Sequence, residues 1–253
     1  MVNVRDRWKE KQGLLIRLMS LIILVMMLSA VIVSNAQAVP VGPQITFNST
    51  TNSTPRPAAA ITTAGGTFTT LTLNATGQTY RWKAYVGNVS GRLVLADANN
   101  MSVFDWRVSS VSGEVYATRS NSIDWSSIAC AATSTIETED TFMNMSTNIP
   151  DTINKTFNYT THRTFFVGGT RISNSTCRSV PTYVNGAAQT VSENAAFQQI
   201  LLQDASANLV YTTLVNASAV SYNGVNRYDF QMIIAENEYN AVPTNYYLYV
   251  ELT

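Results

Sequence analysis

The chain has 253 residues, one histidine and equal numbers of basic and acidic residues, 16 of each, so its formal net charge is zero. This balance excludes the strongly basic surface by which proteins bind nucleic acid or anionic lipid. The length is sufficient for one sizeable hydrophobic core, even after a terminal segment is set aside.

The N-terminal segment has the three parts of a secretory signal peptide. Residues 1–17 are rich in Arg and Lys, an apolar run extends from Leu18 to Val33, and Ala36-Gln37-Ala38 is a small-residue cleavage pattern. We therefore expect residues 1–38 to be removed by cleavage between Ala38 and Val39. The alternative is an uncleaved anchor, although the run is shorter than the about 20 residues of a membrane-spanning helix. That anchor would be the protein's only link to a membrane.

Beyond the expected cleavage point, the chain is dense in N-x-[ST] glycosylation sequons. Each tripeptide alone is a weak signal, but an export signal makes several occupied sites an expectation. The sequon asparagines are Asn48, Asn52, Asn74, Asn88, Asn100, Asn144, Asn154, Asn158, Asn174 and Asn216. Their density predicts an extracellular or cell-surface glycoprotein.

Cys130 and Cys177 are the only two cysteines. An even count in an exported chain predicts one disulfide, which the chain-entropy description values at roughly 4 kcal/mol for a loop of this length. The competing interpretation is two free, buried thiols.

Residues 39–64 are rich in Thr, Ser, Pro and Ala and show no lasting periodicity, which predicts an extended, glycosylated linker. The Gly65-Gly66 pair predicts the start of one folded domain over residues 65–253. Within the linker only Gln44–Phe47 alternates like a strand. Such a segment could add to the open sheet edge of a neighbouring copy, or could pair with its own domain.

The dominant hydrophobic period in the folded part is two, which is typical of half-buried antiparallel strands. Clear examples are Tyr80–Val86, Phe104–Val108, Val115–Ala117, Tyr228–Ile234 and Tyr246–Leu252. Turn-forming clusters separate the strands, at Gly87–Gly91, Asp97–Asn100, Ser112-Gly113 and Asp204–Asn208. Together they predict an all-β fold, an antiparallel β-sandwich of immunoglobulin-like or jelly-roll type.

Residues 119–180 are the least regular part of this domain. They contain both cysteines, four sequons and the acidic cluster Glu137, Glu139 and Asp140. We expect long loops and short strands held together by the disulfide. The acidic cluster has the oxygen ligands that Ca²⁺ prefers but lacks a calcium-loop spacing, which favours a solvated loop.

The sequence contains no recognisable catalytic, cofactor-binding or metal-binding motif. His162, the single histidine, lies in Thr-His-Arg-Thr-Phe-Phe outside any catalytic motif, so we expect it to be bonded to the backbone or water. The remaining candidates for a functional surface are the aromatic residues, namely Trp82, Trp106, Trp125 and the tyrosines. Tyr85, Tyr116, Tyr247 and Tyr249 fall on the face opposite the expected core, where they would bind sugars or lie under a second sheet.

The stretch Tyr80–Gly91, together with Tyr246–Leu252, resembles secreted, sequon-rich surface proteins of archaea. The resemblance implies a cell-envelope setting and assigns no site residues. We therefore expect a non-enzymatic structural or adhesive envelope component, such as a surface-layer-associated protein or a filament subunit. Its expected partners are other envelope proteins, copies of itself or glycans, and not nucleic acid. A carbohydrate-binding module is the alternative, and a glycoside hydrolase is a distant third.

Overall fold

The computed structural model describes residues 39–107, 111–145, 149–237 and 243–253. Residue contacts divide the chain into Met1–Gln37 and Ala38–Thr253, and the described residues all belong to the second unit. The expected signal peptide lies outside the described residues. Among the residues that are described, no helix combines the length and apolar character needed to cross a bilayer.

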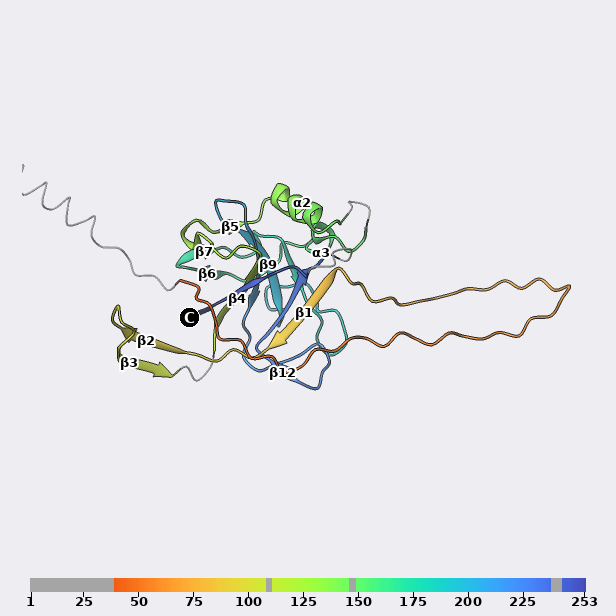
Figure 1. Cartoon of the computed structure of the whole chain (residues 1–253), viewed down its shortest axis with the longest axis horizontal. Helices are drawn as coiled ribbons and strands as arrows, with labels where there is room; N and C mark the ends of the chain where they lie inside the picture. Colours follow the sequence, from red (N-terminus) through yellow and green to blue (C-terminus); the bar gives the residue numbers. More distant parts are fainter. Residues whose placement is uncertain (1–38, 108–110, 146–148, 238–242) are drawn as a thin grey trace, which may run out of the picture. The chain divides into compact units, whose positions relative to one another are not determined.

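The protein is built around one antiparallel sheet of six strands (Figure 1). Five strands lie in the order β14, β4, β10, β9 and β5, and β8 also pairs with β9. Their bounds are β14 Tyr247–Leu252, β4 Gly113–Thr118, β10 Leu209–Leu214, β9 Gln198–Gln203, β5 Ala129–Cys130 and β8 Ser179–Pro181. The mainly antiparallel, sandwich-like β fold predicted from the alternating pattern is confirmed.

The hairpin of β9 and β10 forms the centre of the sheet, and its turn is the one predicted at Asp204–Asn208. The Asp204 carboxylate accepts hydrogen bonds from the backbone N–H groups of Ser206 and Asn208, and Ala207 adopts a positive φ of 58°. Side chains on both faces of these strands are buried, because each face of the sheet is covered by a further layer.

The first face of the sheet is covered by a two-stranded sheet and by two helices. The strands are β1 (Trp82–Gly87) and β13 (Phe230–Ala235), and the helices are α2 (Thr133–Phe142) and α3 (Ile153–Thr156). The core between these layers contains Val115, Ala117, Leu201, Tyr211, Met232, Ile234, Ile136, Ile153 and Phe157.

The opposite face is covered by the hairpin of β6 (Phe165–Val167) and β7 (Thr170–Ile172), together with the short 3₁₀ helix η1 (Trp125–Ser127). Tyr116 lies in this second core with no exposed surface, and its ring is 5.0 Å from that of Trp125. These two side chains are therefore not surface aromatics.

Two further hairpins lie outside these layers: β2 (Arg92–Ala96) with β3 (Ser102–Arg107), and β11 (Ala219–Val220) with β12 (Arg227–Tyr228). The turn predicted at Asp97–Asn100 joins β2 to β3. The other two predicted hairpin turns are wrong, since the strands on either side of Gly87–Gly91 and of Ser112-Gly113 do not pair with each other.

The expectation of loops and short strands for residues 119–180 missed both helices. In α2 the buried side chains are Thr135, Ile136, Glu139 and Asp140. Three of these four are polar, so the helix has no apolar stripe that a periodicity search could detect. The acidic cluster is consequently helical and half-buried rather than a solvated loop.

Residues 42–80, which we call the arm, form no strand or helix. The chain runs out to the Gly65-Gly66 turn and returns to β1 (Figure 1). Every residue from 44 to 80 is exposed, and the first strand begins at Trp82. The exposed segment thus continues beyond residue 64, where the linker was expected to end.

Candidate functional site

The β2–β3 hairpin carries exposed apolar side chains on both of its faces. Val103 is 83% exposed and Trp106 is 50% exposed, and the rings of Phe104 and Trp106 meet edge to face at 5.0 Å. The exposed apolar residues of the hairpin and its turn are Leu93, Val94, Leu95, Met101, Val103, Phe104 and Trp106. Alternation at Phe104 and Trp106 therefore predicted the strand correctly but not its burial.

A two-stranded hairpin is at best marginally stable in water without a further layer of side chains. Here the strands are joined by their ladder and by an exposed Arg92–Asp105 pair at 2.8 Å. Exposed ion pairs add little stability. A contiguous exposed apolar surface on a soluble protein usually marks an interaction site. The hairpin is thus the first candidate contact surface.

The arm is the second exposed apolar element. Its large apolar side chains are Ile45, Phe47, Ile61, Phe68, Leu71 and Leu73, and Phe68 is 94% exposed. Gln44–Phe47, expected to alternate as a strand, forms none in this chain. Just before it, Val41 exchanges two backbone hydrogen bonds with Val250 on β14. Pairing ends there because Pro43, the next residue in register to face β14, has no N–H to donate.

The root of the arm is fixed by Asp151, which lies just before α3. The Thr79 hydroxyl donates to one Asp151 carboxylate oxygen at 2.6 Å, and the Arg81 guanidinium lies 3.5 Å from the other. Trp82 Nε1–H donates to the Asp151 carbonyl at 2.8 Å. These contacts place the end of the arm against the α3 side of the domain.

The third element is the outer edge of β1. Among the described strands, β1 pairs only with β13. Glu236 N–H donates to the Arg81 carbonyl. Because hydrogen-bonded pairs alternate along an antiparallel ladder, the odd-numbered residues of β1 direct their backbone N–H and C=O groups toward β13. The backbone groups of Trp82, Ala84 and Val86 therefore point outward, and the described residues provide no partner for them. An open edge of this kind is a template for another strand.

Two buried carboxylates lie side by side on neighbouring strands of the central sheet. Glu114 on β4 and Glu251 on β14 are cross-strand partners, 5% and 3% exposed. Glu251 accepts hydrogen bonds from the Tyr116 hydroxyl at 2.9 Å and from the Gly168 N–H. Burial, and then the charge of Glu251, raises the pKa of Glu114 to about 8, against the opposing effect of Arg163.

A glycosidase also uses two carboxylates, and both must reach the sugar. Here both are buried, and Tyr116 and Gly168 occupy the oxygens of Glu251. The distant-third hypothesis predicted two converging carboxylates in a cleft. The two residues are cross-strand neighbours, and Glu114 lines a small pocket together with Arg163 and Thr164.

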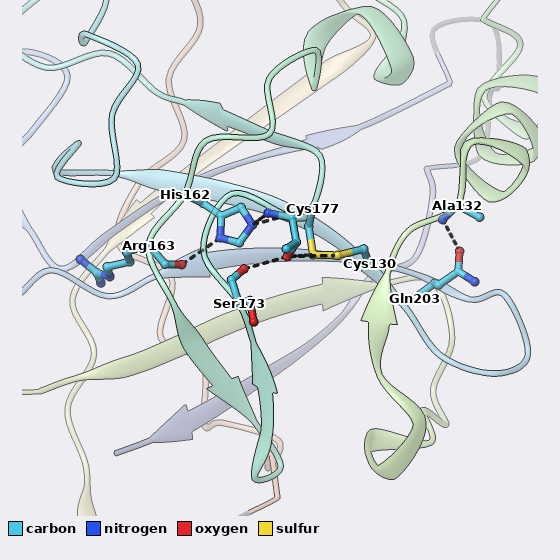
Figure 2. Close-up of a disulfide and its surroundings, with 8 residues drawn as sticks. Cys130, Ala132, His162, Arg163, Ser173, Cys177 and Gln203 are labelled. Carbon is cyan, nitrogen blue, oxygen red and sulfur yellow. Dashed lines mark hydrogen bonds between the residues drawn. A yellow bond between two sulfur atoms is a disulfide. The ribbon is translucent and has the colours of Figure 1, made fainter.

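The predicted disulfide between Cys130 and Cys177 is confirmed, with Cα atoms 4.9 Å apart (Figure 2). His162 lies beside it and has no exposed surface. Its Nε2 accepts the N–H groups of Thr176 at 3.1 Å and Cys177 at 3.0 Å, while Nδ1 lies 2.8 Å from the Arg163 carbonyl. This pattern assigns the proton to Nδ1. The expected bonding of His162 to the backbone is confirmed.

The acidic cluster is divided among different partners. Glu139 binds Arg119 through two contacts of 2.7 Å, and Asp140 accepts the N–H groups of Ile153 and Asn154. Glu137 is exposed. Across the residues that the structure describes, no group of three or more metal-ligating side chains is found.

The sequon asparagines are mostly accessible. Asn154 and Asn216 are partly buried, and the other eight are exposed. Asn216 donates from Nδ2 to the Ala196 carbonyl at 3.0 Å, and Asn174 contacts Glu193.

The expected aromatic platform is less accessible than the sequence suggested. Trp82, Tyr85 and Tyr249 pack partly against the two cores. Of the four tyrosines predicted to share a face, only Tyr247 is exposed. Tyr85 packs against the first core, and Tyr116 and Tyr249 belong to the second, so three of the four are covered.

Comparison with known proteins identifies no relative: no family model, no curated protein and no solved structure matches this chain.

Proposed function

We propose that this protein is a non-enzymatic structural subunit of an extracellular assembly on the cell envelope, in which copies of the chain contact one another. The observation that carries the proposal is the β2–β3 hairpin, whose two faces both expose apolar side chains. A monomer would leave this surface in water, whereas a subunit buries it against a neighbour.

The arm and the open β1 edge support the same proposal. Both are features that a monomeric extracellular protein tends to avoid, since they invite pairing with another chain. The density of sequons and the predicted signal peptide fit an extracellular setting, in which glycans would keep the remaining surface soluble.

The test is self-association of the secreted protein, expressed as the full chain and collected after export. We expect concentration-dependent growth beyond the monomer in sedimentation velocity, and ordered assemblies by electron microscopy. Replacing Val103 and Phe104 by Ser should weaken association, because the apolar surface of the hairpin is reduced. The matched control is Asn99→Ala, which changes an exposed polar side chain in the turn of the same hairpin and should leave association unchanged.

A monomer at millimolar concentration, with wild-type and variant proteins indistinguishable, would contradict the proposal. The carbohydrate-binding alternative is favoured by one observation, the exposed edge-to-face pair of Phe104 and Trp106. Binding of the monomer to a glycan array, lost on Trp106→Ala, would support that alternative instead.

A further inference from the structure

We infer that the returning leg of the arm, Thr67–Leu73, adds as a strand to the outer edge of β1 in a second copy of this chain. The inference rests on the proposed function and specifies how copies would contact one another.

The acceptor consists of the open outer edge of β1 and of partly buried apolar side chains beneath that edge. On the side of β13 away from β1, the Gln199 amide binds both backbone groups of Ile233. β13 is therefore flanked by β9 on that side, and β1 lies toward β4 and β14. Consistent with this, a Cβ added to Gly91, shortly after β1, would lie 2.3 Å from the Leu252 side chain of β14.

A strand added beside β1 would consequently lie over β14. There, Leu248 and Val250 pack against the first core but remain only partly buried. They are separated by one residue, so both face this side of the sheet. The acceptor thus offers main-chain groups at Trp82, Ala84 and Val86, and apolar contacts below them.

The donor has the matching pattern. Thr67–Leu73 is composed of Thr, Phe and Leu and contains no proline or glycine, and both Thr and Phe are enriched in strands. Leu71 and Leu73 are 54% and 87% exposed and would point to the same face of a strand. Asn74 would point to the opposite face of the strand, so a glycan there would be directed away from Leu248 and Val250.

A second copy is the occupant that the geometry favours. In this chain Thr67–Leu73 forms no strand and is exposed throughout, so it does not occupy the edge of its own β1. The end of the arm is held at Asp151 by Thr79, Arg81 and Trp82. An arm that binds a different surface of the next copy forms a head-to-tail contact, which propagates into a chain or filament.

The experiment uses two variants of the secreted full chain. Leu71→Asp/Leu73→Asp disables the donor and leaves the edge intact. Ala84→Pro removes the outward N–H of the edge, which an edge strand tolerates, and leaves the arm intact. Thr70→Asp/Thr72→Asp and Ala84→Ser are the matched controls, because they change the other face of the donor and keep the edge N–H.

Each disabled variant alone should be monomeric, with the dissociation constant for self-association raised about 100-fold or more. In Leu71→Asp/Leu73→Asp the two leucines no longer fill an apolar site, and in Ala84→Pro the edge of β1 no longer pairs. An equimolar mixture of the two should form a heterodimer, because one intact arm then meets one intact edge. Both controls should assemble as the wild type does.

Hydrogen exchange provides a second readout, independent of any variant that fails to fold. The amides of Trp82, Ala84 and Val86 should exchange at least about tenfold more slowly in the wild-type assembly than in the monomer. If wild type assembles while these amides stay unprotected, or while the disabled variants still polymerise, the inference is wrong and the proposed function stands. If wild type does not associate, both fail.

Discussion

Glu114 on β4 lies directly opposite Glu251 on β14, and both residues are nearly buried on the face of the sheet that carries the second core. The folded pKa of Glu114, about 8, lies above its ordinary value of 4.5, chiefly because of burial and secondly because of Glu251. The folded state therefore holds the Glu114 proton more tightly than the unfolded chain does.

It follows that this contribution to stability is complete below about pH 4.5 and is lost as the pH rises to about 8. We expect the free energy of unfolding to fall by on the order of 5 kcal/mol across this range. Glu114→Gln should remove most of the slope. Glu251→Gln should retain the pH dependence but shift it to lower pH, because the charge that raises the pKa of Glu114 is removed. Urea denaturation at a series of pH values measures both, and an unchanged slope in Glu114→Gln would contradict the prediction.

His162 should act in the opposite direction. Burial lowers its pKa below 6.5, and a proton on Nε2 would abolish the two hydrogen bonds accepted from Thr176 and Cys177. Its contribution is complete above about pH 6.5 and is lost as the pH falls below that value. Because the chain has one histidine, NMR titration of the imidazole protons measures this pKa directly. A value above 6.5 would refute the prediction.

Loss of the Cys130–Cys177 disulfide should lower the free energy of unfolding by about 2–4 kcal/mol. The β-sheet signal in circular dichroism should persist, because the two cores contain many other contacts between β4, β9 and β10. Thermal denaturation with and without reductant measures the loss, and Cys130→Ala/Cys177→Ala should be insensitive to reductant. An unchanged melting temperature on complete reduction would be inconsistent with this role.

The Arg119–Glu139 pair should be worth more than an exposed pair of the same kind. Arg119 makes two 2.7 Å contacts to a nearly buried Glu139 and stacks 3.5 Å from the centre of the Phe142 ring. Arg119→Lys loses both the paired geometry and the stacking, so we expect a cost of roughly 2 kcal/mol. The control is Arg92→Lys, whose exposed partner is Asp105 and which should cost under about 0.5 kcal/mol. Equal costs would show that the buried pair has no special role.

Mass spectrometry of the extracellular protein should find Val39 at the N-terminus and glycans at several of the exposed sequons. Asn216 should show the lowest occupancy, because it is partly buried and its amide is bonded to Ala196. Retention of residues 14–38 would instead favour the membrane anchor.

Local features of the sequence predicted several parts of this structure. The alternation in Tyr246–Leu252 and the turn at Asp204–Asn208 predicted β14 and the β9–β10 hairpin, since strand period and turn chemistry depend on neighbouring residues. The disulfide was predictable because the N-terminal sequence predicts export, and two cysteines have one way to pair.

What covers each strand was decided only by the tertiary structure. Tyr116 and Trp106 both lie in alternating strands, yet Tyr116 is enclosed by η1 and β6 while Trp106 is half exposed on a separate hairpin. Alternation distinguishes the two faces of a strand but does not show whether a second layer lies on either face. Likewise, β1 pairs with the distant β13 and Glu114 meets Glu251 through register between strands far apart in the chain. Such pairings depend on the packing of the whole domain, which no short window of sequence contains.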